Sequence, residues 1–279
     1  GNTGPDSRSM GYGPLVRAST GLSSLWCYPD VPNSFADGVT IYPDHVAGRV
    51  AAMGVLALLI RRERTGLGGT VSVSQAEIFL NSNADHYLRE SLQPGTFIAR
   101  GNVSEFRAPE GIYPCAGDDE WCALSVRNDE EWRRLLQVIG RTELLDDSGL
   151  ASMAGRLERR AEVDDLVRAW TSQRSPREVT HQLQGVGLPA GFMIRLSEYR
   201  DDPHFKARDF IRSLEHEGLS EPLPTENRIV QSRYMPEPPL RPAPYQAEHT
   251  RQLAASLLVL QQDQIDTLIA DGDLEDMAP

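Results

Sequence analysis

The feature that most constrains the fold is an apolar run at residues 46–60, in which Arg49 is the only charged residue. Apolar side chains fill nearly every position of this run instead of recurring along one stripe. The pattern therefore predicts a helix over about residues 45–62 that is buried on all sides, at the centre of a domain. The glycines of residues 65–69 predict where this helix ends.

The same run is shorter than the roughly 20 apolar residues that cross a bilayer. No segment at the start resembles a signal peptide. The chain carries 28 basic and 40 acidic residues, a net charge of −12, which disfavours nucleic acid and anionic membranes as partners. We therefore expect a cytoplasmic protein with no nucleic-acid or membrane partner.

The three cysteines, Cys27, Cys115 and Cys122, do not have the spacing of metal ligands and cannot all pair with one another. This pattern is typical of reduced, mostly buried thiols in a cytoplasmic protein. The sequence predicts no metal site.

Residues 1–95 have the pattern of part of a large α/β domain. The first 40 residues predict loops with at most a short helix. Alternation at residues 70–73 predicts a short strand, and Ser74 and Glu77 form a capping box that starts a helix ending near Glu90. Helix, glycine turn, strand and helix in this order are typical of the units that build a parallel sheet.

Residues 96–205 have a different composition, which predicts a small α+β domain. Residues 111–115 and 121–126 predict two strands joined by a turn. Three helices are predicted after them, one following Asn128 and ending at Gly140, one over residues 156–170, and one opening at Ser175.

Residues 206–279 predict a connector and a last helix. Seven prolines between Pro222 and Pro244 indicate an extended segment. An amphipathic helix is predicted over residues 246–270. A lone amphipathic helix needs a surface for its apolar face, and we expect it to return to the large domain.

Asp44 is the main candidate for chemistry, because common phosphate-binding, dinucleotide-binding, zinc-hydrolase and serine-hydrolase motifs are missing from the sequence. It stands just before the long helix, where an aspartate often caps the helix. The helix dipole also favours an ionised carboxylate there, and such a carboxylate can act as a nucleophile. Both roles remain open from the residues alone.

Several segments resemble the class III CoA-transferases, the family that includes formyl-CoA and carnitine CoA-transferases. Gly-Asn-Thr-Gly-Pro at residues 1–5 resembles the family segment G-Q-T-G-P, and residues 44–48, 54–57, 61–66 and 71–77 resemble its run of Asp, helix and glycine turn. Further landmarks follow in family order at residues 101–102, 108–109, 111–115, 187–191, 202–203 and 248–250.

The resemblance implies that Asp44 is the catalytic nucleophile and that CoA, as part of the acyl-CoA substrate, contacts Gly11, Tyr12, Gly13 and Pro14. It also implies an interlocked homodimer and a Rossmann-like large domain. The chain begins inside a family motif, so most of the CoA-binding half is expected on a preceding segment or a partner chain.

Other reactions of the same fold remain alternatives. Related α-methylacyl-CoA racemases use a histidine near the position of Tyr12, and a phenol is a poor base near neutral pH. Lyases are a further alternative, as is a non-catalytic scaffold or split subunit. The glycine-rich loop of formyl-CoA transferases is replaced by residues 104–109, which argues against oxalate as the acceptor.

Overall fold

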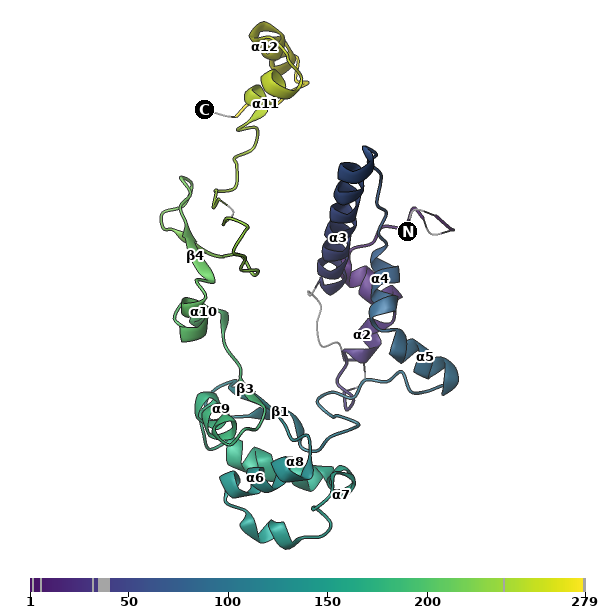
Figure 1. Cartoon of the computed structure of the whole chain (residues 1–279), viewed down its shortest axis with the longest axis vertical. Helices are drawn as coiled ribbons and strands as arrows, with labels where there is room; N and C mark the ends of the chain where they lie inside the picture. Colours follow the sequence, from purple (N-terminus) through teal and green to yellow (C-terminus); the bar gives the residue numbers. More distant parts are fainter. Residues whose placement is uncertain (2, 6, 32, 35–40, 238, 278–279) are drawn as a thin grey trace. The chain divides into compact units, whose positions relative to one another are not determined.

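The computed structural model describes residues 1–279 except 2, 6, 32, 35–40, 238 and 278–279. The chain divides into two compact units, residues 1–193 and 194–279, and each is described by itself (Figure 1). The described residues at the start of the first unit form five helices. They are α1 (Gly13–Ser19), α2 (Leu22–Leu25), α3 (Tyr42–Thr65), α4 (Gln75–Ser82) and α5 (Ala84–Leu92).

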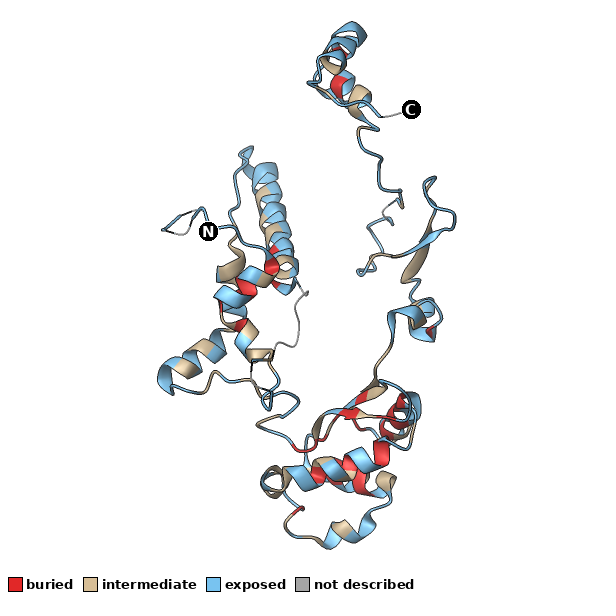
Figure 2. Cartoon of the chain, turned by 180° about the vertical axis from the view of Figure 1, so that it is seen from behind, coloured by how far each residue is buried: buried red, intermediate tan, exposed pale blue. Residues whose placement is uncertain are grey.

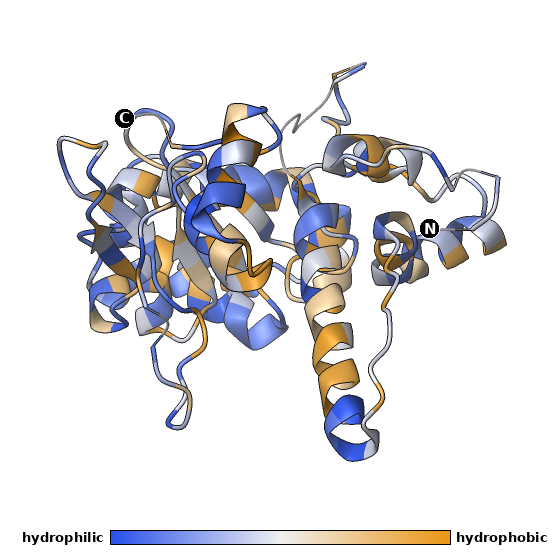
Figure 3. Cartoon of the chain, turned by 90° about the horizontal axis from the view of Figure 1, so that it is seen from above, coloured by the Kyte–Doolittle hydropathy of each residue, from blue (hydrophilic) through white to orange (hydrophobic). Residues whose placement is uncertain are grey.

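The long helix predicted from the apolar run is confirmed as α3, which ends at Gly66 in the left-handed conformation with φ of 74°. The prediction that it is buried on all sides is wrong for this chain. Only Pro43 and Ala47 are buried, and Met53 and Leu56 are 69% and 59% exposed. Figures 2 and 3 show an exposed helix whose middle turns are hydrophobic.

The reason is that only α1 and α4, both near the start of α3, contact this helix extensively. The whole helix α3 is longer than the apolar run, and by length and composition it could cross a membrane. The prediction that the segment is too short for a bilayer therefore does not hold for α3. Core helices of water-soluble proteins meet the same criterion. An apolar surface of this size is costly in water and is expected to be covered.

The strand predicted at residues 70–73 is wrong, because the segment has no hydrogen-bonded neighbour and is not a strand. The described part of residues 1–95 therefore contains helices only. The cap at Ser74 is confirmed, since its Oγ accepts the Glu77 N–H at 3.4 Å. The single helix predicted after it is two helices, α4 and α5, separated at Asn83.

Residues 110–193 combine strands and helices, as predicted, while a separate small domain over residues 96–205 stays a prediction. Strands β1 (Glu110–Pro114), β2 (Trp121–Ser125) and β3 (Ala190–Phe192) form an antiparallel sheet in the order β1-β2-β3. Tyr113 pairs with Cys122 and Ala123 with Gly191. The third strand was not predicted.

Helices α6 (Asp129–Ile139), α7 (Met153–Glu158), α8 (Arg160–Thr171) and α9 (Pro176–Gly185) belong to the same region, with a 3₁₀ turn at Thr142–Asp146. Gly140 ends α6 as predicted, with φ of 71°. The helix predicted over residues 156–170 is split into α7 and α8 at Arg159. The core lies between sheet and helices and includes Trp132, Leu135, Val163, Val179 and Leu183 (Figure 2). Cys115 and Cys122 are buried and all three cysteines are free, as predicted.

The second unit contains a 3₁₀ turn at Leu196–Glu198, α10 (Pro203–Ala207), the hairpin of β4 (Ile211–Leu214) and β5 (Leu223–Glu226), α11 (Thr250–Leu257) and α12 (Gln262–Ala270). The single last helix that the sequence predicts is wrong. The helix is interrupted after Leu257, and Val259 has φ of 56°, a conformation that no β-branched residue adopts within a helix. Ala254 and Ile265 are buried where α11 and α12 meet. Docking of these helices on the large domain stays a prediction.

Candidate active site

Asp44 lies in the first turn of α3, and it does not cap this helix. The N-cap position is Ile41, which has no side-chain cap hydrogen bond, and Tyr42 and Pro43 precede Asp44 in the helix. The Asp44 N–H donates to the Ile41 carbonyl at 3.0 Å. The helix-cap role left open by the sequence is therefore wrong, while the carboxylate still sits at the end of the helix where the dipole favours negative charge.

Gln75, the first residue of α4, holds one oxygen of this carboxylate. Its Nε2 donates to Asp44 Oδ1 at 2.9 Å, across 31 residues of sequence. Ser74 caps the start of α4. The Tyr42 ring of α3 meets the buried Phe79 ring of α4 edge to face, with centroids 6.1 Å apart, and so packs the two helices together.

Gly13, the first residue of α1, lies against the other carboxylate oxygen. A Cβ atom added to Gly13 would come within 2.1 Å of Asp44 Oδ2 and 2.9 Å of Ile41 Cα. Real Cβ atoms do not approach so closely, so only glycine fits here without moving Asp44 or the backbone of α3. Gly11 lies beside Gln75, because a Cβ there would be 3.3 Å from Gln75 Oε1.

Asp44 Oδ2 is buried and has no hydrogen-bond partner among the described residues. Buried polar atoms in native proteins are nearly always paired, and an exception commonly marks a reactive or ligand-binding group. Gly13 lies directly against this oxygen, within the segment of residues 11–14. Within that segment Tyr12 is 63% exposed, Gly13 is buried and Pro14 is half-buried.

The structure thus brings together Asp44, Gly11 and Gly13, which the sequence had proposed, and adds Gln75, which it had not. In the sequence, Gln75 is one residue of the segment 71–77 that resembles the family. The signal available in the sequence was a polar side chain at the start of a helix that follows the long helix. Among the described residues, no group of three or more His, Cys, Asp or Glu side chains is arranged to hold a metal ion.

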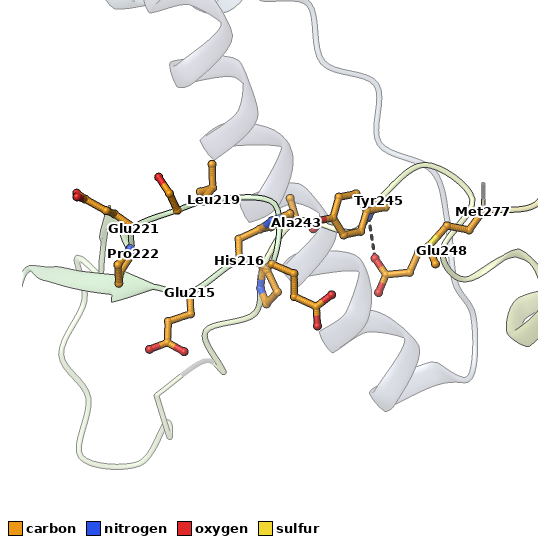
Figure 4. A pocket seen from close by; sticks show the side chains of 12 residues that line it. Glu215, His216, Leu219, Glu221, Pro222, Ala243, Tyr245, Glu248 and Met277 are labelled. Carbon is orange, nitrogen blue, oxygen red and sulfur yellow. Dashed lines mark hydrogen bonds between the residues drawn. The ribbon is translucent and has the colours of Figure 1, made fainter. Parts of the chain in front are cut away.

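A hollow of about 710 Å³ lies in the second unit, and none of the predicted site residues lines it. Its polar side chains make hydrogen bonds to nearby backbone, and Figure 4 marks the one between Tyr245 and Glu248. The Gly218 N–H donates to His216 Nδ1 at 2.9 Å, and the Tyr245 N–H donates to Glu248 at 2.7 Å. The His216 ring packs edge to face on Tyr245. These contacts explain the shape of the turn.

The sequence matches the model of CoA-transferase family III over residues 1–250. A probable CoA-transferase of Mycobacterium tuberculosis is 40% identical, over 96% of this chain and 34% of that protein. Succinyl-CoA–D-citramalate CoA-transferase of Chloroflexus aurantiacus is 32% identical, over 97% of this chain and 66% of that protein. Succinate–glutarate CoA-transferase of Agrobacterium fabrum is 28% identical, over 92% and 63%.

The chain thus spans 34% of the length of the first of these relatives and just under two thirds of the other two. Among solved structures, a CaiB/BaiF family protein from Brucella suis has a TM-score of 0.79 at 22% identity, covering 92% of this chain and 65% of its own. A Mycobacterium tuberculosis protein has a TM-score of 0.70 at 22% identity, covering 89% and 65%. These structures share the fold. By the match over residues 1–250, the chain belongs to CoA-transferase family III.

Proposed function

We propose that the protein transfers CoA from an acyl-CoA to a free carboxylic acid, with Asp44 as the nucleophile. The observation that carries this proposal is the state of the Asp44 carboxylate. One oxygen is held by Gln75, and the other is buried, unpaired and placed against Gly13. The names of the three relatives, all CoA-transferases, support the same reaction.

The proposed reaction proceeds in balanced steps. Asp44 Oδ2 attacks the thioester carbonyl carbon, the carbon–sulfur bond breaks, and CoA leaves as a thiolate. The thiolate then attacks Asp44 Cγ in the resulting anhydride, releasing the donor acid and forming an aspartyl-CoA thioester. The acceptor carboxylate attacks the same Cγ and expels CoA again. The returning thiolate attacks the acceptor carbonyl, which forms the new acyl-CoA and regenerates Asp44. Covalent catalysis divides one difficult exchange into easier steps.

Residues 11–14 are the proposed CoA-contacting segment. Glycine at positions 11 and 13 lets backbone come close to Asp44 and Gln75, and the same lack of side chains allows a substrate to approach closely. An apolar residue stands on each side of the segment, Met10 before it and Leu15 after it. Both side chains are exposed, Met10 to 72%. CoA bound there would bring its thioester to Asp44.

We propose dicarboxylic acids as the first substrates to examine. The supporting observation is that the similar proteins named above include one for succinyl-CoA and D-citramalate and one for succinate and glutarate. Residues 104–109 read Ser-Glu-Phe-Arg-Ala-Pro and contain no glycine, so this chain lacks the flexible glycine loop expected of an oxalate-specific enzyme.

For the assembly, we propose that a Rossmann-like part of the large domain, outside this chain, covers α3, and that two copies form an interlocked homodimer. The exposed apolar residues of α3 support this proposal. The proline-rich residues 222–244 would cross between domains, because proline favours extended backbone. Helices α11 and α12 would return to the large domain.

The test is the change Asp44→Asn in the full-length protein, assayed for CoA transfer from succinyl-CoA to D-citramalate. An amide of the same size keeps the shape of the side chain but cannot act as the nucleophile. We expect exchange to fall to background with an unchanged melting temperature, because Asp44 caps no helix.

Asp85→Asn is the matched control, since Asp85 is an exposed acid in the first turn of α5, and this variant is expected to stay active. Normal exchange by the Asp44→Asn variant would remove Asp44 from the mechanism.

A further inference from the structure

The geometry points to Gln75 as a positioning residue that decides which oxygen of Asp44 reacts. This inference rests on the proposed function and deepens it. Gln75 Nε2 donates to Oδ1 at 2.9 Å, whereas Oδ2 has no partner among the described residues. The two oxygens of a free carboxylate are equivalent, so the protein environment alone makes them different here.

Gln75 is held in a way that suits this role. It occupies the first helical position of α4, directly after the cap residue Ser74, and its side chain is half-buried. Its Oε1 lies next to Gly11, while its Nε2 reaches Asp44. The Gln75 amide therefore links the start of α4 to the start of α3 and to the segment before α1. Its nitrogen and its oxygen have different neighbours, which fixes the orientation of the amide.

The charge of the donor matters for the chemistry. Among the described residues, Asp44 forms no ion pair, and its side-chain hydrogen bond comes from a neutral amide. A lysine or arginine at this place would stabilise the carboxylate strongly and so weaken it as a nucleophile. A neutral donor fixes the orientation of the carboxylate and withdraws less negative charge from Oδ2 than a cation would.

The same N–H would act in the later steps. When Oδ2 carries the acyl group or has been replaced by the CoA sulfur, Oδ1 is the carbonyl oxygen of the aspartyl intermediate. Attack of the thiolate or of the acceptor carboxylate on Cγ moves an electron pair onto Oδ1, and loss of the leaving group returns it. A donor already aimed at that oxygen stabilises the tetrahedral species.

Two variants of the full-length protein test the inference. Gln75→Met removes the donor at similar size, and we expect kcat to fall about 100-fold, the usual effect of losing one such donor, with KM little changed. Gln75→Glu places a second carboxylate at hydrogen-bond distance from Asp44, and two adjacent carboxylates share a proton at a higher pH than either would hold one alone. We expect the acidic limb of its pH–rate profile to move up by about one pH unit or more.

Gln182→Glu is the matched control, because the Gln182 amide also donates to an acid, Glu178, at 3.1 Å on the exposed face of α9. It should leave kcat and the pH profile unchanged. The inference about Gln75 would be overturned by a kcat of Gln75→Met within twofold of wild type. It would also be overturned if a folded Gln75→Glu variant kept the acidic limb of its pH–rate profile where the wild type has it. In either case, CoA exchange by the wild type would still support the proposed function. If Gln75→Glu does not fold, the kcat of Gln75→Met decides alone. Absence of exchange in the wild type would overturn both.

Discussion

Asp44 is the centre of the proposed site, with Gln75 on one carboxylate oxygen and Gly13 against the other. The resemblance to a known family predicted Asp44 and the glycines of residues 11–14. It could not predict Gln75, because the contact joins the starts of two helices that are 31 residues apart. The cap role considered for Asp44 fails because the helix begins three residues earlier than the apolar run indicates.

Gly13→Ala tests the close approach of α1 to the carboxylate. The new Cβ would lie 2.1 Å from Asp44 Oδ2, so either Asp44 must rotate away from Gln75 or α1 must shift. Because a displacement of about 1 Å at a reacting group costs about 100-fold in rate, we expect kcat for CoA transfer to fall by about that factor.

The control for this variant is Gly48→Ala on α3, where a new Cβ meets no atom within 4 Å. That variant should keep its activity and gain up to about 1 kcal/mol in helix stability. Wild-type activity in Gly13→Ala would show that the contact between Gly13 and Asp44 is unimportant for the reaction.

At the scale of elements, the sequence predicted best where local signals and burial agree. The β1–β2 hairpin and α6 lie within a few residues of their predicted bounds, because turn, cap and apolar spacing all occur in one short stretch. Predicted single helices were wrong at Asn83, Arg159 and residues 258–261. Continuous helical spacing does not reveal a local change of backbone conformation such as the positive φ of Val259.

The buried carboxylate of Glu131, in the first turn of α6, provides a stability prediction. Glu131 is 1% exposed, and its carboxylate accepts the Arg127 N–H at 2.7 Å and the Arg127 Nε at 2.9 Å. The hydrogen bond from the Arg127 side chain is the main cause that lowers the pKa of Glu131, against the opposing effect of burial. Because the folded pKa is depressed, the ionised group stabilises the fold above the unfolded pKa of about 4.3, and this contribution is lost as the pH falls through the folded value.

We therefore expect Glu131→Gln to destabilise the fold by about 1 kcal/mol at pH 7, and the difference from wild type to shrink on acidification below about pH 4. Thermal melts across this pH range measure it. Glu130→Gln, an exposed first-turn acid in the same helix, is the control and should be neutral. A difference between Glu131→Gln and wild type that stays constant down to pH 2 would exclude the ionised carboxylate as the source.

At the scale of the whole molecule, the helix α3 was predicted correctly and its environment was not. Its apolar residues specify a buried helix, yet α1 and α4 cover only its first turns. Farther along the helix, residues 69–71 lie against Gly54 and Leu58, and most of the remaining surface is exposed. The strand predicted at residues 70–73 fails for a related reason, because a strand requires a neighbour to pair with. The apolar residues of α3 indicate that its surface must be covered, but the sequence does not indicate which segment covers it.

The exposed surface of α3 leads to a prediction about the 279-residue chain on its own. Met53, Val55, Leu56 and Ile60 are all more than half exposed, and contiguous apolar surface of this kind drives association. We expect light scattering to show oligomers, and heating to give a broad transition. A monodisperse monomer with a sharp cooperative melt would contradict this expectation.

The most direct test of the central claim is chemical trapping at Asp44 during turnover of the full-length protein. A transferase that works through Asp44 passes through an anhydride and a thioester, both electrophilic at Asp44 Cγ. Hydroxylamine added with succinyl-CoA should convert Asp44 to a hydroxamate, seen as a mass change on its peptide, and deuterium from the solvent should not enter the acyl chain. Deuterium in the acyl chain with unmodified Asp44 would indicate proton transfer of the racemase kind and would contradict the account.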